Sequence, residues 1–174
     1  CKEHGRRNLY AEFSHDGTRI VTAMVNGTAV VGAAPGTSSA GQTPEPTRLE
    51  GHTAFLTTAA FSPDDRLVAT ASADGTIRVT PADDPSAGWQ LVGHGKTVTS
   101  VAFSPDGRLI ASSGWDNSIR LWGRLSGAPL ADLPATDARY GLCMSGNCGD
   151  YVPHCFHSSL STDPARSPVS RETW

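Results

Sequence analysis

Residues 98–122, "VTSVAFSPDGRLIASSGWDNSIRLW", indicate the fold because a close copy of them stands earlier in the chain. The copy, residues 56–80, has the sequence "LTTAAFSPDDRLVATASADGTIRVT", and 12 of the 25 positions are identical. Repetition at a period of about 20–50 residues is typical of solenoids and propellers. We therefore treat the repeat as the primary signal for the fold and interpret single residues within its register.

A third, weaker copy precedes these two. Phe-Ser pairs begin at Phe13, Phe61 and Phe103, so the first interval is slightly longer than the second. A histidine stands at the same offset before each phenylalanine, and an acidic or amide residue stands at one constant offset after each histidine. The histidines are His4, His52 and His94, and the residues that follow them are Asn26, Asp74 and Asp116. The Gly/Ser/Pro-rich segment 32–46 explains the longer first interval, and we expect it to form an enlarged surface loop.

Each copy has the pattern of short β-strands joined by tight turns. In the third copy we expect strands at residues 97–103, 108–113, 118–122 and 128–133. The "SPDG" stretch between the first two strands supplies proline and aspartate where a β-turn needs them. Glycine and proline are abundant, at 18 and 12 residues, which also suits a turn-rich β protein. Four short antiparallel strands in every copy of the repeat predict one propeller blade per copy.

The pattern "GH…AFSPDG…ASSGWDNSIRLW" resembles a WD40 repeat, and the resemblance covers roughly residues 4–135. It implies an all-β fold, a partial WD40-like β-propeller of about three four-stranded blades. The repeats would occupy about residues 4–46, 52–88 and 94–135, all within a repeat region at 1–135. Residues 136–174 lose the register and are predicted to be a degenerate fourth blade or an irregular or disordered tail; a frame error in the coding sequence would give the same appearance.

The resemblance also implies a structural role for four side chains in each copy. WD40 blades of this kind contain a hydrogen-bonded chain of histidine, a hydroxyl on the second strand, a turn aspartate and a tryptophan on the third strand. The third copy has the complete set, while Thr80 in the second copy and Gly32 in the first replace the tryptophan. Because each link contributes about 1 kcal/mol, we expect the second blade to be looser than the third and the first looser still. The residues concerned are His94, Ser112, Asp116 and Trp122; His52, Thr70 and Asp74; and His4, Thr22 and Asn26.

A Ser/His/Asp set also raises the alternative of a hydrolase. The set recurs once per copy, however, and none of the copies has the G-x-S-x-G turn that exposes a nucleophilic serine. The sequence also lacks a phosphate-binding P-loop and a dinucleotide fingerprint. We therefore predict a protein that is not an enzyme, with no catalytic residues and no cofactor.

Partner contacts in WD40 proteins usually lie at one end of the blades, on the first strand and just before the turn aspartate. Trp115 is the most pointed candidate, because a tryptophan beside a polar turn has no evident core role and large aromatic residues often anchor interfaces. Phe55 is the second; packing against a neighbouring blade is the alternative for both rings. The resemblance assigns the same role to Thr97, Thr99, Thr57 and Ala73, and in the first copy to Arg7, Leu9 and Val25.

Charge patterning favours a protein or peptide partner. The formal net charge is −3 and the basic residues are scattered, which argues against nucleic acid and anionic membranes as partners. The sequence has no apolar run long enough to span a bilayer and no secretion signal, so we expect a cytoplasmic location. The predicted function is a non-catalytic interaction scaffold. The alternative is a regulatory or sensor C-terminal module of a multidomain signalling NTPase or kinase whose catalytic part lies outside this chain, by analogy with similar Pro- and Ala-rich repeats.

Two further expectations concern the tail and the number of blades. Thiols and imidazoles gather near the C-terminus, which raises zinc as a hypothesis. The tail has no CxxC pair, so we predict no metal site. Three blades are too few for a ring of about 4–8, so we expect the remaining blades from a longer parent chain or another subunit. The tail residues concerned are Cys143, Cys148, His154, Cys155 and His157.

Overall fold

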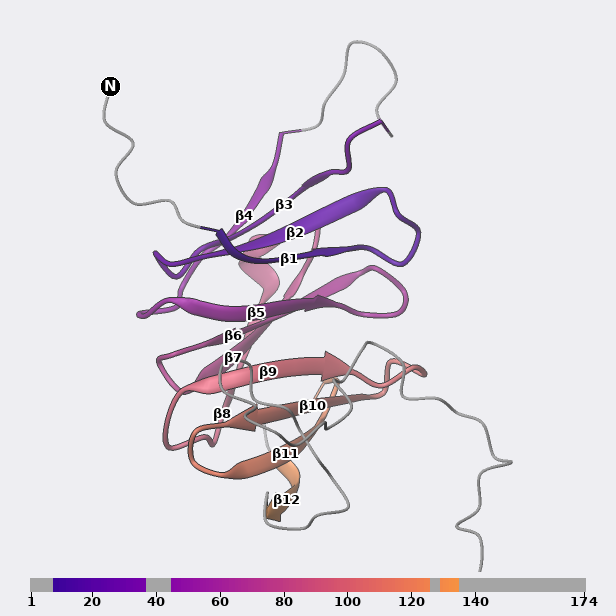
Figure 1. The fold of residues 1–174 in the computed structure, drawn as a ribbon. Coiled ribbons are helices and arrows are strands. Elements are labelled where there is room, and N and C mark those ends of the chain that lie inside the picture. The colour runs from indigo at the N-terminus through magenta and orange to yellow at the C-terminus, as the bar shows by residue number, and fades with distance from the viewer. Residues whose placement is uncertain (1–7, 37–44, 126–128, 135–174) are drawn as a thin grey trace, which may run out of the picture.

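The computed structural model describes residues 8–36, 45–125 and 129–134, and these form three four-stranded antiparallel sheets (Figure 1). Within each sheet the strands follow chain order. The described residues include no α-helix, and no helix among them is long and apolar enough to cross a membrane. The predicted all-β fold class is therefore confirmed. The strands are β1 (Asn8–Phe13), β2 (Arg19–Met24), β3 (Ala29–Ala33) and β4 (Thr47–Leu49); β5 (Leu56–Phe61), β6 (Leu67–Ser72), β7 (Thr76–Pro81) and β8 (Trp89–Val92); and β9 (Val98–Phe103), β10 (Leu109–Gly114), β11 (Ser118–Gly123) and β12 (Pro129–Pro134), with a short 3-10 helix, η1 (Pro85–Ala87), before β8.

The turns between the first two strands, Ser-Pro-Asp in the second and third sheets and Ser-His-Asp in the first, are built by their own side chains. In the turn between β9 and β10, the Ser104 hydroxyl donates to Asp106 Oδ1 at 2.6 Å and accepts from the Leu109 N–H at 2.9 Å. Ser62 and Ser14 make the same pair of bonds in the other two sheets. A local side-chain bond of this kind reverses the chain without help from the rest of the fold. The repeated sequence therefore produces the same hairpin three times.

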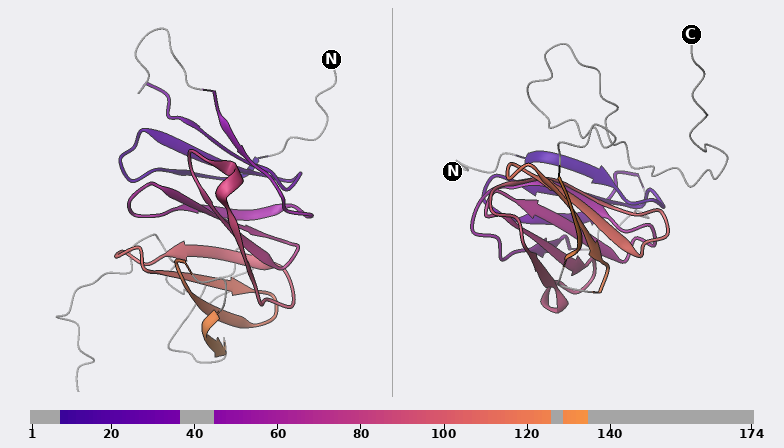
Figure 2. Two further views of the ribbon diagram at one scale, coloured as in Figure 1. Left: turned by 180° about the vertical axis from the view of Figure 1, so that it is seen from behind. Right: turned by 90° about the horizontal axis from the view of Figure 1, so that it is seen from below.

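The three sheets stack face to face and fan apart toward their later strands. β5 contacts β1 and β2 of the first sheet and β9 of the third, so the contacts between sheets gather on the early strands. Figures 1 and 2 show the first, second and third sheets following one another along the stack. All six residues of β6 are buried, because the middle sheet is covered on both faces. This wedge-like stacking is the packing expected of neighbouring propeller blades.

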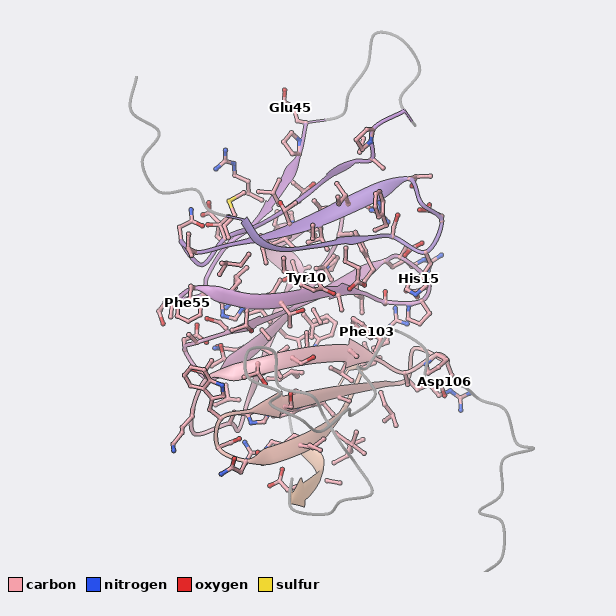
Figure 3. All side chains as sticks on the ribbon, viewed as in Figure 1. Tyr10, His15, Glu45, Phe55, Phe103 and Asp106 are labelled. Atoms are coloured by element: carbon pink, nitrogen blue, oxygen red, sulfur yellow. The ribbon has the colours of Figure 1, made fainter. Side chains whose placement is uncertain are left out.

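The turns of the sheets gather at two opposite ends. Figure 3 shows Phe55 at one end, and His15 and Asp106 at the other. We call these the Phe55 end and the His15 end. The turns that join the first and second strands of each sheet lie at the His15 end, and the turns that join the second and third strands lie at the Phe55 end. The histidines and the predicted contact residues therefore belong to the Phe55 end.

Asp65 joins the first sheet to the second at the His15 end. Its carboxylate accepts the backbone N–H groups of His15 at 2.7 Å and of Asp16 at 2.9 Å, and Arg19 Nη2 donates to its backbone carbonyl. Asp65 has a φ of 55°, in the left-handed region, where the first and third sheets have glycines at φ 70° and 67°. The strain of this conformation is therefore offset by bonds that a glycine could not make.

Replacing Asp65 separates the two effects. We expect Asp65→Ala to lower the free energy of unfolding by about 1–3 kcal/mol, because two N–H groups of the neighbouring sheet lose their acceptor. Asp65→Gly loses the same acceptor but relieves the left-handed strain, so it should cost about 1 kcal/mol less. Chemical denaturation of both variants provides the measurement. Stability equal to that of the wild type in both would show that Asp65 does not join the sheets.

Candidate functional site

His94 lies at the centre of a hydrogen-bonded chain inside the third sheet. Its Nδ1 lies 3.0 Å from Asp116 Oδ1, and its Nε2 lies 2.8 Å from Ser112 Oγ. Trp122 Nε1 donates to the same hydroxyl oxygen at 2.8 Å. His94 precedes β9, Ser112 is on β10, Asp116 is in the following turn and Trp122 is on β11. The structure therefore brings together all four residues that the repeat pattern groups in the third copy.

The partners fix the direction of each bond. The Asp116 carboxylate also accepts the Gly95 N–H at 3.1 Å and the Ser118 hydroxyl at 2.8 Å. A carboxylate only accepts, so His94 Nδ1 carries the proton and Nε2 accepts from the Ser112 hydroxyl. The hydroxyl oxygen in turn accepts from the Trp122 indole. Every polar side-chain group among His94, Ser112, Asp116 and Trp122 thus has a hydrogen-bond partner, which is what burial requires.

Burial also sets the charges of this group. The His94 side chain is fully buried, and burial lowers the pKa of its imidazole despite the opposing effect of Asp116. Burial alone would raise the pKa of the Asp116 carboxyl, but hydrogen bonds from His94, Ser118 and Gly95 lower it well below its usual range. This hydrogen-bonded group therefore contains a neutral imidazole and an ionised carboxylate near neutral pH.

The second sheet repeats two of the three links. His52 Nδ1 lies 2.9 Å from Asp74 Oδ2, and His52 Nε2 lies 3.0 Å from Thr70 Oγ1. Burial lowers the pKa of His52. Burial would raise the pKa of Asp74, but bonds led by the Thr76 hydroxyl and His52 lower it to about 2. The second sheet therefore has the same neutral imidazole and charged carboxylate, without the indole.

Arg78 lies against the glycine before the histidine in the second sheet, whereas in the third sheet both Trp122 and the equivalent Arg120 lie near that position. In the third sheet, a Cβ added at Gly93 would lie 2.9 Å from Trp122 Cη2. In the second sheet, a Cβ at the equivalent Gly51 would lie 2.8 Å from Arg78 Cζ. The guanidinium thus covers the glycine that the indole covers in the third sheet. Arg78 Nε is buried without a hydrogen-bond partner, whereas the equivalent Arg120 pairs with Asp132 at 2.7 Å.

Sequence reasoning did not identify Arg78. Gln90 is opposite Arg78 on β8, where the third sheet has Asp132 opposite Arg120. The signal available in the sequence was an arginine two residues before Thr80, which replaces the tryptophan, and opposite Gln90, which replaces an acid.

In the first sheet, Thr22 Oγ1 donates weakly to the Val30 carbonyl at 3.4 Å, and Asn26 Oδ1 accepts from the Thr28 N–H at 3.2 Å. His4 and Arg7 lie outside the described residues.

The chain of His94, Ser112 and Asp116 has the connectivity of a hydrolytic triad but not its access. The Ser112 residue is only 2% exposed, and its oxygen already bonds both the imidazole and the indole. A nucleophile needs an open approach to the carbonyl that it attacks. The same arrangement in the second sheet, with Thr70, indicates a repeated structural element.

The predicted contact residues lie at the Phe55 end but differ in exposure. Trp115 is 59% exposed and Phe55 is 42% exposed. Thr97, Thr57, Thr99 and Ala73 are half-buried. The Thr57 hydroxyl donates to the Val98 carbonyl of the next sheet at 2.7 Å, and Thr99 Oγ1 donates to the Ser113 carbonyl at 3.1 Å. In the first sheet, Leu9 is exposed and Val25 is half-buried. Trp115 is therefore the most exposed of the described residues in the predicted set, followed by Leu9 at 49% and Phe55 at 42%.

Among the residues that the structure describes, no group of three or more His, Cys, Asp or Glu side chains could hold a metal ion. The tail cysteines and histidines that raised the zinc hypothesis lie outside the described residues. So does the whole of the predicted degenerate blade at 136–174.

The indole N–H of Trp122 can be tested against a matched control. We expect Trp122→Phe to lower the free energy of unfolding by about 1–2 kcal/mol, because the ring is kept but the Ser112 oxygen loses a donor. Trp122→Ala should cost about 3–5 kcal/mol, because a buried ring is lost.

Trp89 supplies the control, since its buried Nε1 has no hydrogen-bond partner. Trp89→Phe should therefore cost less than Trp122→Phe in the same denaturation experiment. Equal costs would mean that the bond from Trp122 to Ser112 contributes nothing measurable.

The buried histidines predict an acid-sensitive fold. A lowered pKa in the folded state means that the unfolded chain binds protons first as the pH falls. Stability should therefore be complete above the ordinary histidine value of 6.5 and decline below it. A second decline should begin below pH 3.8, the ordinary pKa of an aspartate, because the Asp74 carboxyl has a pKa of about 2 in the folded state and the unfolded chain binds the proton first. We expect His94→Gln to be less stable at pH 7 and to show a smaller decline between pH 6.5 and about pH 5 in denaturation midpoints. An unchanged decline would contradict this origin.

Comparison with known proteins supports this geometry. The family described as "WD domain, G-beta repeat" matches residues 44–80 and 87–123, which include the two similar stretches 56–80 and 98–122. Among solved structures, one titled "Crystal Structure of Mitotic Checkpoint Complex" is similar, with a TM-score of 0.65 and 21% sequence identity. The similarity covers 77% of this chain but only 39% of that chain. No curated protein matches by sequence. Residues 44–80 and 87–123 are therefore WD40 repeats, and the three described sheets are folded like blades of a WD40 propeller.

Proposed function

We propose that the chain is a non-catalytic interaction module that binds a protein or peptide partner at the Phe55 end, with Trp115 and Phe55 as its anchors. The observation that supports this most directly is their exposure. Trp122, Phe61 and the large aliphatic residues of the core are buried, whereas these two rings are 59% and 42% exposed. Large aromatic side chains are enriched among residues that dominate binding energy.

The backbone beneath both rings is fixed by hydrogen bonds. The Trp115 N–H donates to the Thr97 carbonyl at 2.9 Å, and the Phe55 carbonyl accepts the Ala73 N–H at 3.0 Å. The bond from Thr57 to Val98 joins the two sheets close to these sites. This backbone would therefore lose little conformational freedom when a partner binds, which favours affinity.

The buried histidine chains support the same end from below. His52 and His94 connect the loops before β5 and β9 to the turns that contain Ala73 and Trp115. Their carboxylates, Asp74 and Asp116, are already satisfied inside the sheets, with side chains only 10% and 14% exposed. These two carboxylates thus add little exposed charge at this end, where Glu50 and Lys96 are the exposed charged residues of the loops before β5 and β9. An apolar or aromatic peptide side chain is the chemistry that fits it.

A peptide selected against the chain tests the proposal. Peptides selected from a random displayed library on the wild-type chain would be ranked by dissociation constant. We expect Trp115→Ala to weaken the tightest of them at least tenfold, about 1.4 kcal/mol, with an unchanged circular dichroism spectrum. Phe55→Ala should weaken them less.

Leu125→Ala provides the matched control, because Leu125 is 85% exposed and follows β11 at the opposite end of that strand from Trp115. It should leave the dissociation constants unchanged. Equal affinity of the wild type and Trp115→Ala for every selected peptide would contradict the proposal.

A further inference from the structure

The first and third sheets each have one face that no other described sheet covers. In the first sheet this face carries Phe13 and Ile20, which lie opposite each other on β1 and β2. Phe13 is 58% exposed, although the alternating residues Val21 and Ala23 are fully buried against the second sheet. The first sheet is therefore apolar on both faces but buried on only one of them.

The repeat register gives this uncovered face a meaning. Phe13 and Ile20 are equivalent to Phe61 and Val68 of the second sheet. Phe61 is 2% exposed and Val68 is fully buried, and both belong to the core between the first and second sheets. The pair at the same positions in the third sheet, Phe103 and Ile110, packs against the second sheet in the same way. The uncovered face of the first sheet thus has the pattern of a face that packs on a preceding sheet.

The uncovered face of the third sheet has the opposite pattern. Leu109 and Leu121 are equivalent to Leu67 and Val79, which are 7% and 0% exposed in the core between the second and third sheets. In the third sheet Leu109 is 37% exposed and Leu121 half-buried. This face therefore has the pattern that receives a following sheet. Figure 1 places the two uncovered faces at opposite ends of the stack.

We propose that two copies of this chain associate head to tail, with the Leu109 face of each copy packed on the Phe13 face of the other. The contact between a Leu109 face and a Phe13 face would repeat the two contacts that the chain already forms internally, between the first and second sheets and between the second and third sheets. A second copy is the occupant that offers both complementary faces in register. The two contacts together close six sheets into a ring, which lies within the range of about 4–8 blades of known propellers. A heterologous contact that closes on itself yields a finite assembly instead of a filament.

Complementary variants distinguish this arrangement from other modes of association. Phe13→Glu and Leu109→Glu each place a charge in one of the two proposed faces, at positions that are exposed in the single chain, so the fold should be retained. Sedimentation velocity on the full chain should show a concentration-dependent dimer for the wild type. Each variant alone should dimerise at least tenfold more weakly.

Mixing the two variants should give tighter dimers than either variant alone, but weaker ones than the wild type because the second contact then holds both added charges. The intact Leu109 face of Phe13→Glu then meets the intact Phe13 face of Leu109→Glu, so one of the two contacts is free of the added charges. Val92→Glu is the control, because Val92 is 61% exposed on β8 of the middle sheet, away from both faces. It should dimerise like the wild type.

Three outcomes would overturn the proposal. One is a wild-type chain that stays monomeric throughout the micromolar range, as expected if residues of the same chain cover these faces. The second is a dimer that Phe13→Glu disrupts and Leu109→Glu does not, or the reverse, which indicates a symmetric contact. The third is growth beyond dimers, which indicates an open array. None of these results bears on peptide binding at the Phe55 end.

Discussion

A buried imidazole must satisfy both of its nitrogens, and this requirement organises each of the two better-preserved sheets. His94 meets it by bonding a turn carboxylate on one side and a strand hydroxyl on the other. The loop before β9, the second strand and the turn before β11 are thereby fixed to one another. An unpaired buried member would cost about 1–3 kcal/mol, so the histidine has both of its partners in each of these two sheets. The position of Trp115 at the edge of the same turn follows from that constraint.

The three sheets solve the same packing problem with decreasing completeness. The third sheet has the full chain with its indole. The second keeps the imidazole, hydroxyl and carboxylate, and Arg78 covers the glycine that an indole would cover. In the first sheet Gly32 stands at the tryptophan position and His4 lies outside the described residues. The turn between β1 and β2 is bonded to the carboxylate of Asp65 in the second sheet. Contacts between sheets thus replace part of what contacts within the sheet no longer supply.

The repeat was sufficient to predict the all-β fold, the four strands per copy and the sets of residues around His52 and His94, because these depend on contacts within one copy. It could not predict the role of Asp65, because the left-handed backbone of this aspartate is stabilised by hydrogen bonds to the backbone of another sheet. The position of Arg78 against Gly51 was equally hidden, because it depends on how the side chain lies in the folded sheet. Thr57 and Thr99 illustrate the limit for the candidate site. Their positions in the repeat indicate partner contact, but the structure gives both hydroxyls acceptors within the chain. The family model matches two copies, yet the first copy forms the same four-stranded sheet, because backbone pairing tolerates the loss of the marker side chains.

The claim on which this account depends most is that the His94 chain is a closed internal structure and not a reactive site. Nitrogen-15 NMR of the full chain at neutral pH measures it directly, through the tautomer of His94 and the hydrogen exchange of the Trp122 indole. The account predicts a neutral imidazole protonated at Nδ1, and an indole N–H that exchanges as slowly as the core amides of β10 and β11. An imidazole that shows mixed tautomers, together with an indole N–H that exchanges as fast as that of exposed Trp115, would contradict it.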